Sequence, residues 1–265
     1  MQTGLIDNRD NRAAVVESAR RALGPVGAFL PAPTSAAPSV DLQRDAVRRL
    51  ERAGYRAAWT NEVIGKDALV QLAVLLAATE RMVFGTGIAN IWARSAQTSQ
   101  GAAALLAQAY PGRLVLGLGV GYPEQAASVG REFGRPLATM RGYLERMAAP
   151  AQLPVPEGAY PRIIGANGPK MLALAAEAAD GALPAMVAPE FTAEARRLLG
   201  PDKLLVILVD AGAGAGDAAT LAATVGAHLT AGADHVTVGL PIGTEFDTGV
   251  DRLEQLAPAL LEPAA

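Results

Sequence analysis

The chain has no cysteine and only two histidines among its 265 residues. Without cysteine it can form no disulfide, thiolate metal site or iron–sulfur cluster, and it has no cysteine nucleophile. His228 and His235 alone cannot make a histidine-rich metal site. Any acid–base chemistry therefore has to come from carboxylates, tyrosine, lysine or bound water. The lack of disulfides also fits a reducing compartment.

Charge is scarce as well, at 18% of residues against 51% hydrophobic, and the net charge is −3. No basic patch interleaved with aromatic residues is present, so nucleic acid is not an expected partner. Residues 1–21 lack the apolar centre of a signal peptide, and no later run reaches the roughly 18 apolar residues of a membrane span. We therefore expect a cytoplasmic protein with no membrane partner that acts on a small molecule.

Short apolar runs alternate with longer segments of helical period, which is typical of repeated βα units around a parallel sheet. Most runs have four to seven residues and are apolar on both faces, as buried parallel strands are. Eight strands are expected: Val26–Leu30, Arg56–Thr60, Met82–Ile88, Arg113–Gly119, Arg162–Gly165, Gly181–Met186, Leu204–Asp210 and His235–Leu240. The pattern predicts one domain over residues 24–265, preceded by a polar leader at 1–23.

The predicted helices fill the gaps between these strands. They span Asp41–Ala53, Asp67–Thr79, Ser95–Ala109, an interrupted stretch from Glu124 to Met147, Pro169–Ala179, Pro189–Leu199, Asp217–Ala231 and Gly249–Leu261. Asp41, Asp67, Ser95 and Asp217 are the expected N-caps. Eight βα units close naturally into a minimal (β/α)8 barrel, whereas the open doubly wound alternative usually has five or six strands and a glycine-rich loop after the first. No such loop follows the first run, so the barrel is favoured.

Active sites of β/α barrels lie at the C-terminal ends of the strands, so the residues that follow each strand are the candidates. The fifth strand runs through Gly165, Ala166, Asn167 and Gly168 into a helix that begins with Pro169 and Lys170. Backbone N–H groups at such a helix start bind phosphate, with Asn167 donating from its amide and Lys170 adding a positive charge. The alternative is an ordinary capped turn, because glycine and asparagine are common in turns.

Four other residues at strand ends are candidates for chemistry. Gly119 and Gly121, in the alternating run Gly117–Gly121, would let a planar ring approach the backbone, although close packing also explains them and is favoured by the pattern alone. Glu62 is a candidate for proton transfer, or else a solvated loop carboxylate. Tyr122 would line the pocket or cover its loop.

Arg94 follows the third strand. It is expected to bind an anionic cofactor tail, or instead to cap carbonyl groups or form a surface ion pair.

A resemblance adds to this interpretation. The stretch GTGIANIWARSAQTSQGAAALLAQAYPGRLVLGLGVGY, from Gly85 to Tyr122, resembles the central block of the bacterial luciferase-like flavin and deazaflavin oxidoreductases. RDAVRRLERAGYRAAWTNE (Arg44–Glu62) and IIGANGPKMLALAAEAADGALP (Ile163–Pro184) resemble flanking pieces, so the similarity runs from about Val26 to Pro189.

The resemblance implies a TIM-type barrel that binds FMN or coenzyme F420, with the ring across the strand ends near Ala89, Asn90 and Gly119–Tyr122. It places the phosphate at Gly165–Gly168 and a non-prolyl cis peptide near Ala89–Asn90. Actinobacterial members with the pattern Gly-Thr-Gly-Ile-Ala-Asn look most like deazaflavin enzymes. Coenzyme F420 is therefore the expected cofactor, with FMN as the alternative.

Two departures from the family pattern bear on the activity. Sugar-phosphate dehydrogenases of the family carry a histidine where this chain has Asn61-Glu62, and an acid where it has Tyr122. We therefore expect another substrate, a hydride transfer with coenzyme F420, and Glu62 or Tyr122 as the proton partner. An FMN-dependent monooxygenase and a non-catalytic cofactor-binding protein are the alternatives. Alanine-rich helix faces are compatible with a homodimer.

Overall fold

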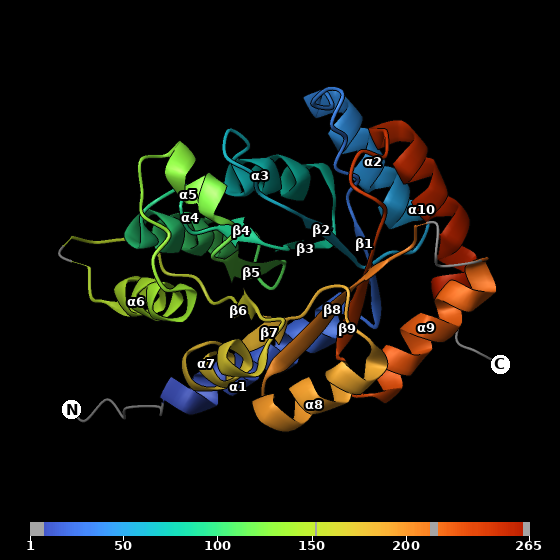
Figure 1. Ribbon diagram of the computed structural model, residues 1–265. Coiled ribbons are helices and arrows are strands. Elements are labelled where there is room, and N and C mark those ends of the chain that lie inside the picture. The colour runs from blue at the N-terminus through green and yellow to red at the C-terminus, as the bar shows by residue number, and fades with distance from the viewer. Residues whose placement is uncertain (1–7, 152, 213–216, 262–265) are drawn as a thin grey trace, which may run out of the picture.

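The computed structural model describes residues 8–151, 153–212 and 217–261, and its centre is a closed barrel of parallel strands (Figure 1). The strands are β1 (Val26–Phe29), β2 (Ala57–Thr60), β3 (Val83–Thr86), β4 (Ala89–Asn90), β5 (Leu114–Gly119), β6 (Arg162–Gly165), β7 (Gly181–Leu183), β8 (Leu204–Asp210) and β9 (His235–Gly239). They are hydrogen-bonded in the order β3-β2-β1-β9-β8-β7-β6-β5-β4, and pairing of β3 with β5 closes the ring. The short β4 follows β3 and, like β3, pairs with β5. Strands β3 and β4 therefore occupy one position in the ring, and the barrel is eight-stranded, as predicted.

Helices surround the barrel in the described part of the chain (Figure 1). They are α2 (Val40–Arg52), α3 (Ala68–Ala78), α4 (Ala96–Ala109), α5 (Pro123–Ser128), α6 (Pro136–Ala148), α7 (Pro169–Ala178), α8 (Pro189–Leu199), α9 (Ala218–Thr230) and α10 (Phe246–Leu261). Asp67, Ser95 and Asp217 cap their helices as predicted. The prediction for Asp41 is wrong because α2 begins one residue earlier, at Val40, where Ser39 accepts a hydrogen bond from the Leu42 N–H.

Helix α1 (Asn8–Leu23) lies within the segment that was expected to be a polar leader. Val16, Ala19 and Leu23 lie three and four residues apart, so they share one face of the helix. All three are buried, in one cluster with side chains from inside the barrel. The helix therefore covers the amino-terminal end of the barrel and leaves the opposite end for the candidate site.

Successive residues of a strand face opposite sides, which fixes what points into the barrel. Trp59 belongs to the interior cluster, whereas Ala58 belongs to the larger cluster between strands and helices. Within the interior, the Trp59 indole N–H donates to His235 Nε2 over 3.0 Å. None of the helices in the described part of the chain combines the length and apolarity that crossing a bilayer requires.

Candidate functional site at the C-terminal strand ends

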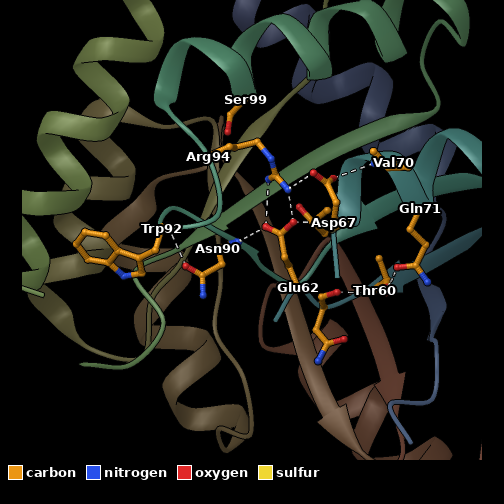
Figure 2. A network of polar contacts seen from close by, with 12 residues as sticks. Thr60, Glu62, Asp67, Val70, Gln71, Asn90, Trp92, Arg94 and Ser99 are labelled. Atoms are coloured by element: carbon orange, nitrogen blue, oxygen red, sulfur yellow. Dashed lines mark hydrogen bonds and ion pairs between the residues drawn. The ribbon is translucent and has the colours of Figure 1, made fainter. Parts of the chain in front are cut away.

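Glu62 follows β2 and is almost completely buried, at 3% exposed, which rules out the solvated-loop alternative. Its carboxylate accepts hydrogen bonds from the backbone N–H of Ala68 (2.8 Å) and of Asn90 (2.7 Å). It also accepts from both terminal nitrogens of Arg94, one of them at 3.1 Å (Figure 2). Because both oxygens already have donors, Glu62 holds three segments of the site together.

Arg94 lies in a buried ion pair, and its side chain is 8% exposed. Besides Glu62, its guanidinium contacts Asp67 Oδ2 at 3.0 Å (Figure 2). Burial alone would lower the pKa of Arg94, but the two carboxylates outweigh it and raise the pKa above its ordinary value. The alternative of a surface ion pair for Arg94 is thus wrong, because the pair is buried. The guanidinium that was expected to bind a cofactor tail is committed to protein carboxylates.

Asn90 ends β4, opposite Gly119 on β5, and is 1% exposed. Its side-chain oxygen accepts from the Trp92 N–H at 2.9 Å (Figure 2). Its amide nitrogen is buried and has no hydrogen-bond partner among the residues that the structure describes. A buried donor without an acceptor is rare in folded proteins, because losing its water is unfavourable unless another acceptor replaces it. Asn90 therefore offers a donor that is ready for an acceptor atom of a bound molecule.

The glycines of β5 make room for protein atoms. A Cβ on Gly117 would lie 2.0 Å from the Thr86 carbonyl oxygen, and one on Gly119 would lie 2.5 Å from Ile88 Cδ1. The prediction that a ring approaches the backbone directly at Gly119 is therefore wrong, because the Ile88 side chain fills that space. Gly121 adopts a φ of +57°, and a Cβ there would lie 3.0 Å from the free Asn90 nitrogen. Close packing and a turn thus explain the glycine run.

Ile88 also reaches the end of β6, where its Cγ2 lies 3.4 Å from the Cβ position of Gly165. The peptide bond between Gly87 and Ile88 is cis, two residues before the position that the resemblance implies. Ile88 therefore connects the ends of β5 and β6, and any flat molecule above these strands would meet its side chain.

The turn from β6 into α7 has the predicted form, with Gly168 as N-cap and Pro169 in the first turn. The Asn167 side chain is committed differently from the prediction, because its oxygen accepts from the Ala185 N–H (2.9 Å) and its nitrogen donates to the Ala185 carbonyl (3.1 Å). Asn167 thereby ties this turn to the loop after β7. Ala166 is buried and donates its N–H to the Leu183 carbonyl at 3.4 Å. Lys170 is exposed, so its amine remains accessible to an anion.

Exposed apolar side chains follow four strands at this end of the barrel. They are Val63 (46% exposed), Tyr122 (70%), Met186 (60%) and Ile242 (82%). Only Tyr122 was singled out from the sequence. Met186 and Ile242 lie in strand-end segments that the sequence marks as candidates, but a single apolar residue in a loop carries no periodic signal that would distinguish it.

Sequence reasoning also missed Lys66, in the loop between β2 and α3. Its ammonium donates to Thr60 Oγ1 and Asn61 Oδ1, each at 3.0 Å. Burial lowers the pKa of Lys66 to about 8, against an opposing effect of Glu62. The one available signal was its position, six residues beyond the end of a predicted strand in a chain with few lysines.

A cavity elsewhere, beside α1, is lined by Arg12, Tyr160 and Arg162 and lies apart from the strand-end residues. It is not part of the candidate site.

Comparison with known proteins gives three kinds of match. A family model described as luciferase-like monooxygenase matches residues 25–200. A Mycobacterium tuberculosis protein, named as a coenzyme F420-dependent oxidoreductase, is 32% identical over 175 residues, which cover 54% of this chain and 50% of that protein. The 5,10-methylenetetrahydromethanopterin reductase of Methanolobus tindarius is 31% identical over 151 residues, which cover 50% of this chain and 46% of that one. The chain thus spans about half the length of the curated relatives it matches.

Solved structures resemble the whole barrel at low sequence identity. An F420-dependent secondary alcohol dehydrogenase, in complex with an F420-acetone adduct, has a TM-score of 0.68 and 16% identity, over 90% of this chain and 99% of the other. The F420-dependent tetrahydromethanopterin reductase of Methanopyrus kandleri has a TM-score of 0.67 and 15% identity, over 88% and 98%. At these identities the likeness supports the fold.

Proposed function

The chain belongs to the luciferase-like monooxygenase family, and from this premise we propose that it is an oxidoreductase transferring a hydride between coenzyme F420 and a small organic substrate. The proposal rests mainly on two curated relatives: one is named as a coenzyme F420-dependent oxidoreductase and the other as a methylenetetrahydromethanopterin reductase. The matched family region, 25–200, contains the strand-end residues described above. The proposal thus places the activity at that end of the barrel.

The strand-end residues fit a deazaflavin. Its ring carries carbonyl oxygens, and the free Asn90 amide nitrogen is a buried donor that lacks an acceptor among the described residues. Its phosphate would meet the start of α7, where Gly168 is the N-cap, the positive end of the helix dipole favours an anion and Lys170 adds a positive charge. Ala89 and Gly121 are neighbours of Asn90, so their backbone atoms would lie beside the ring. We infer that Asn90, Gly168 and Lys170 contact the cofactor.

The bound deazaflavin would supply the hydride chemistry, and the protein would supply position and exclusion of water. Arg94 and Glu62 hold the backbone of Asn90, so the free amide nitrogen stays in one place. Ile88 and Trp92 present apolar surface beside it. Because this donor is already fixed, it loses little conformational freedom when the cofactor binds, and it would hold the ring in one orientation.

A residue that exchanges a proton with the substrate needs an atom that is not already occupied by hydrogen bonds to the protein. Both Glu62 oxygens already accept from Arg94 and the backbone, so we propose that Glu62 is a positioning residue. Tyr122 is exposed at the start of α5 and remains a candidate for contact with the substrate.

A binding titration tests the cofactor assignment. Purified protein is titrated with coenzyme F420 and, separately, with FMN, and the visible absorbance of each is followed. We expect micromolar affinity for F420 and weaker binding of FMN. Lys170→Ala should weaken F420 binding about tenfold, which corresponds to about 1.4 kcal/mol for a charge-assisted contact. Tight FMN binding without F420 binding would contradict the proposal and favour the monooxygenase alternative.

Turnover separates an enzyme from a cofactor-binding protein. An FMN-dependent monooxygenase would consume oxygen, whereas the proposed enzyme would change the visible band of F420 only when a substrate is present. Bound F420 that no candidate substrate changes would favour the non-catalytic alternative. The expected homodimer and cytoplasmic location stay predictions, and light scattering on the purified protein tests the first.

A further inference from the structure

Lys66 is held at the end of β2 by neutral oxygen atoms. Its ammonium donates to Thr60 Oγ1 and to Asn61 Oδ1, each at 3.0 Å. Thr60 Oγ1 donates in turn to Gln71 on α3 (3.0 Å), and Gln71 donates to Gln43 on α2 (2.7 Å). In the described part of the chain, Lys66 forms no ion pair with a carboxylate. Its charge is therefore positioned without being neutralised.

The ammonium lies beyond the end of β2, between the barrel mouth and the starts of α2 and α3, because Thr60 faces the helices and Asn61 faces the mouth. Trp59 points into the interior, so Asn61, two residues further along, continues the same side of the strand past its end. Gln43 and Gln71 belong to the first turns of α2 and α3, which start at this end of the barrel. Because Lys66 contacts Asn61, its amine is within reach of a molecule seated over the strand ends.

Glu62 is the charged group that influences the pKa of Lys66, and it lies beside Arg94 and Asp67. Glu62 and Asp67 are both paired with Arg94, whose single positive charge compensates one of their two negative charges. Burial lowers the pKa of Lys66 to about 8, and Glu62 opposes this only in part. At neutral pH the amine is mostly protonated, yet it gives up its proton far more easily than an ordinary lysine.

We propose that Lys66 is the proton donor and acceptor of the hydride transfer. An ammonium in this role suits a substrate with a polarised double bond, a carbonyl compound or the corresponding alcohol, because the oxygen becomes strongly basic as its carbon accepts a hydride. This rests on the proposed function. In the reducing direction reduced F420 would supply the hydride: its C–H bond would break as a new C–H bond forms at the carbonyl carbon and the C=O π bond breaks, and the N–H proton of the oxidised ring would pass to solvent. The oxygen takes a proton from the Lys66 ammonium, which becomes an amine and regains a proton from solvent. Alcohol oxidation is the reverse.

The chain has only three lysines, Lys66, Lys170 and Lys203, so each can be followed separately without any cofactor. Trace acetylation at a series of pH values, read by mass spectrometry, gives a midpoint for each amine. We expect the Lys66 midpoint about two pH units below the ordinary lysine value of about 10.4. A Lys66 midpoint at that ordinary value would overturn the proposal.

Two variants then test the role in catalysis, with reduced F420 and cyclohexanone or acetone as probes. Lys66→Gln should lower kcat about 10²-fold or more, as loss of a general acid does, while F420 affinity stays unchanged. Lys66→Arg keeps the charge but cannot lose its proton, so the basic limb of the pH profile should disappear. Wild-type kcat in Lys66→Gln would overturn the inference and leave the proposed function intact.

Two further results are distinguishable from these. Failure of the wild-type protein to bind F420 would remove the proposed function, whatever the midpoint of Lys66. Binding of F420 without reduction of any ketone probe would overturn the carbonyl assignment alone.

Discussion

Glu62 and Arg94 illustrate how burial changes the role of a charged residue. From the sequence, one was a candidate proton carrier and the other an anion ligand. In the fold the two residues form a buried ion pair, and either charge left unpaired in this buried position would be strongly destabilising. The sequence could not predict the pair, since the two residues follow different strands and meet only because the loops after β2 and β4 converge.

Replacing Glu62 by glutamine tests that pairing. The change keeps the shape but removes the charge, so Arg94 would retain only Asp67. We expect the free energy of unfolding to fall by about 3 kcal/mol, the lower end for breaking a buried pair. Urea denaturation measures it. Glu177→Gln is the control, since Glu177 pairs with Arg141 at the surface and its loss should leave the midpoint unchanged. Equal effects of the two changes would contradict the account.

His235 predicts a pH dependence of stability. Its Nε2 accepts from Trp59, so the hydrogen on Nδ1 donates to the Gly24 carbonyl at 2.7 Å, and the ring is neutral. Burial lowers its pKa from 6.5 to about 4. Below pH 6.5 the unfolded chain therefore binds a proton that the folded one does not, and stability falls as pH drops towards 4.

The expected loss from this group is about 2 kcal/mol between pH 7 and pH 5. Urea denaturation of the wild-type protein and of His235→Phe at both pH values measures it. The variant loses the Trp59 contact at every pH, but its stability should fall less on acidification. An identical pH dependence in both proteins would contradict the assignment.

At the level of elements, periodicity found the strands and the helices around them, because buried parallel strands are short apolar runs and amphipathic helices repeat every three to four residues. Helix α1 was missed for a physical reason: it is polar overall, and its buried face is marked by a few small or apolar residues, Val16, Ala19 and Leu23. The N-cap at Ser39 was missed because Asp41, also a good cap, stands two residues later.

A single substitution tests whether α1 is an integral part of the barrel. Leu23 is fully buried, so Leu23→Ala should lower the free energy of unfolding by about 3 kcal/mol. Leu105→Ala on α4 is the matched control, since that leucine is 54% exposed and its removal should have little effect. Thermal and urea unfolding measure both. A small effect of Leu23→Ala would mean that α1 does not contribute to the folded barrel.

For the whole molecule, the barrel follows from eight βα units, whereas the details of its mouth do not. The turn at Gly165–Lys170 was recognisable because its residues are contiguous in sequence. The buried nitrogen of Asn90 and the Ile88 side chain over Gly119 depend on closure between different strands. The position of the Lys66 ammonium depends on how its own loop folds back onto Thr60 and Asn61.

The central claim is that coenzyme F420 binds at the C-terminal strand ends. Hydrogen–deuterium exchange of the protein, with and without F420, tests binding and location together. We expect slower exchange at residues 88–94, 119–125 and 165–172, and no change at residues 8–23 on the opposite face. Protection confined to residues 8–23, or no protection anywhere at saturating F420, would contradict the account.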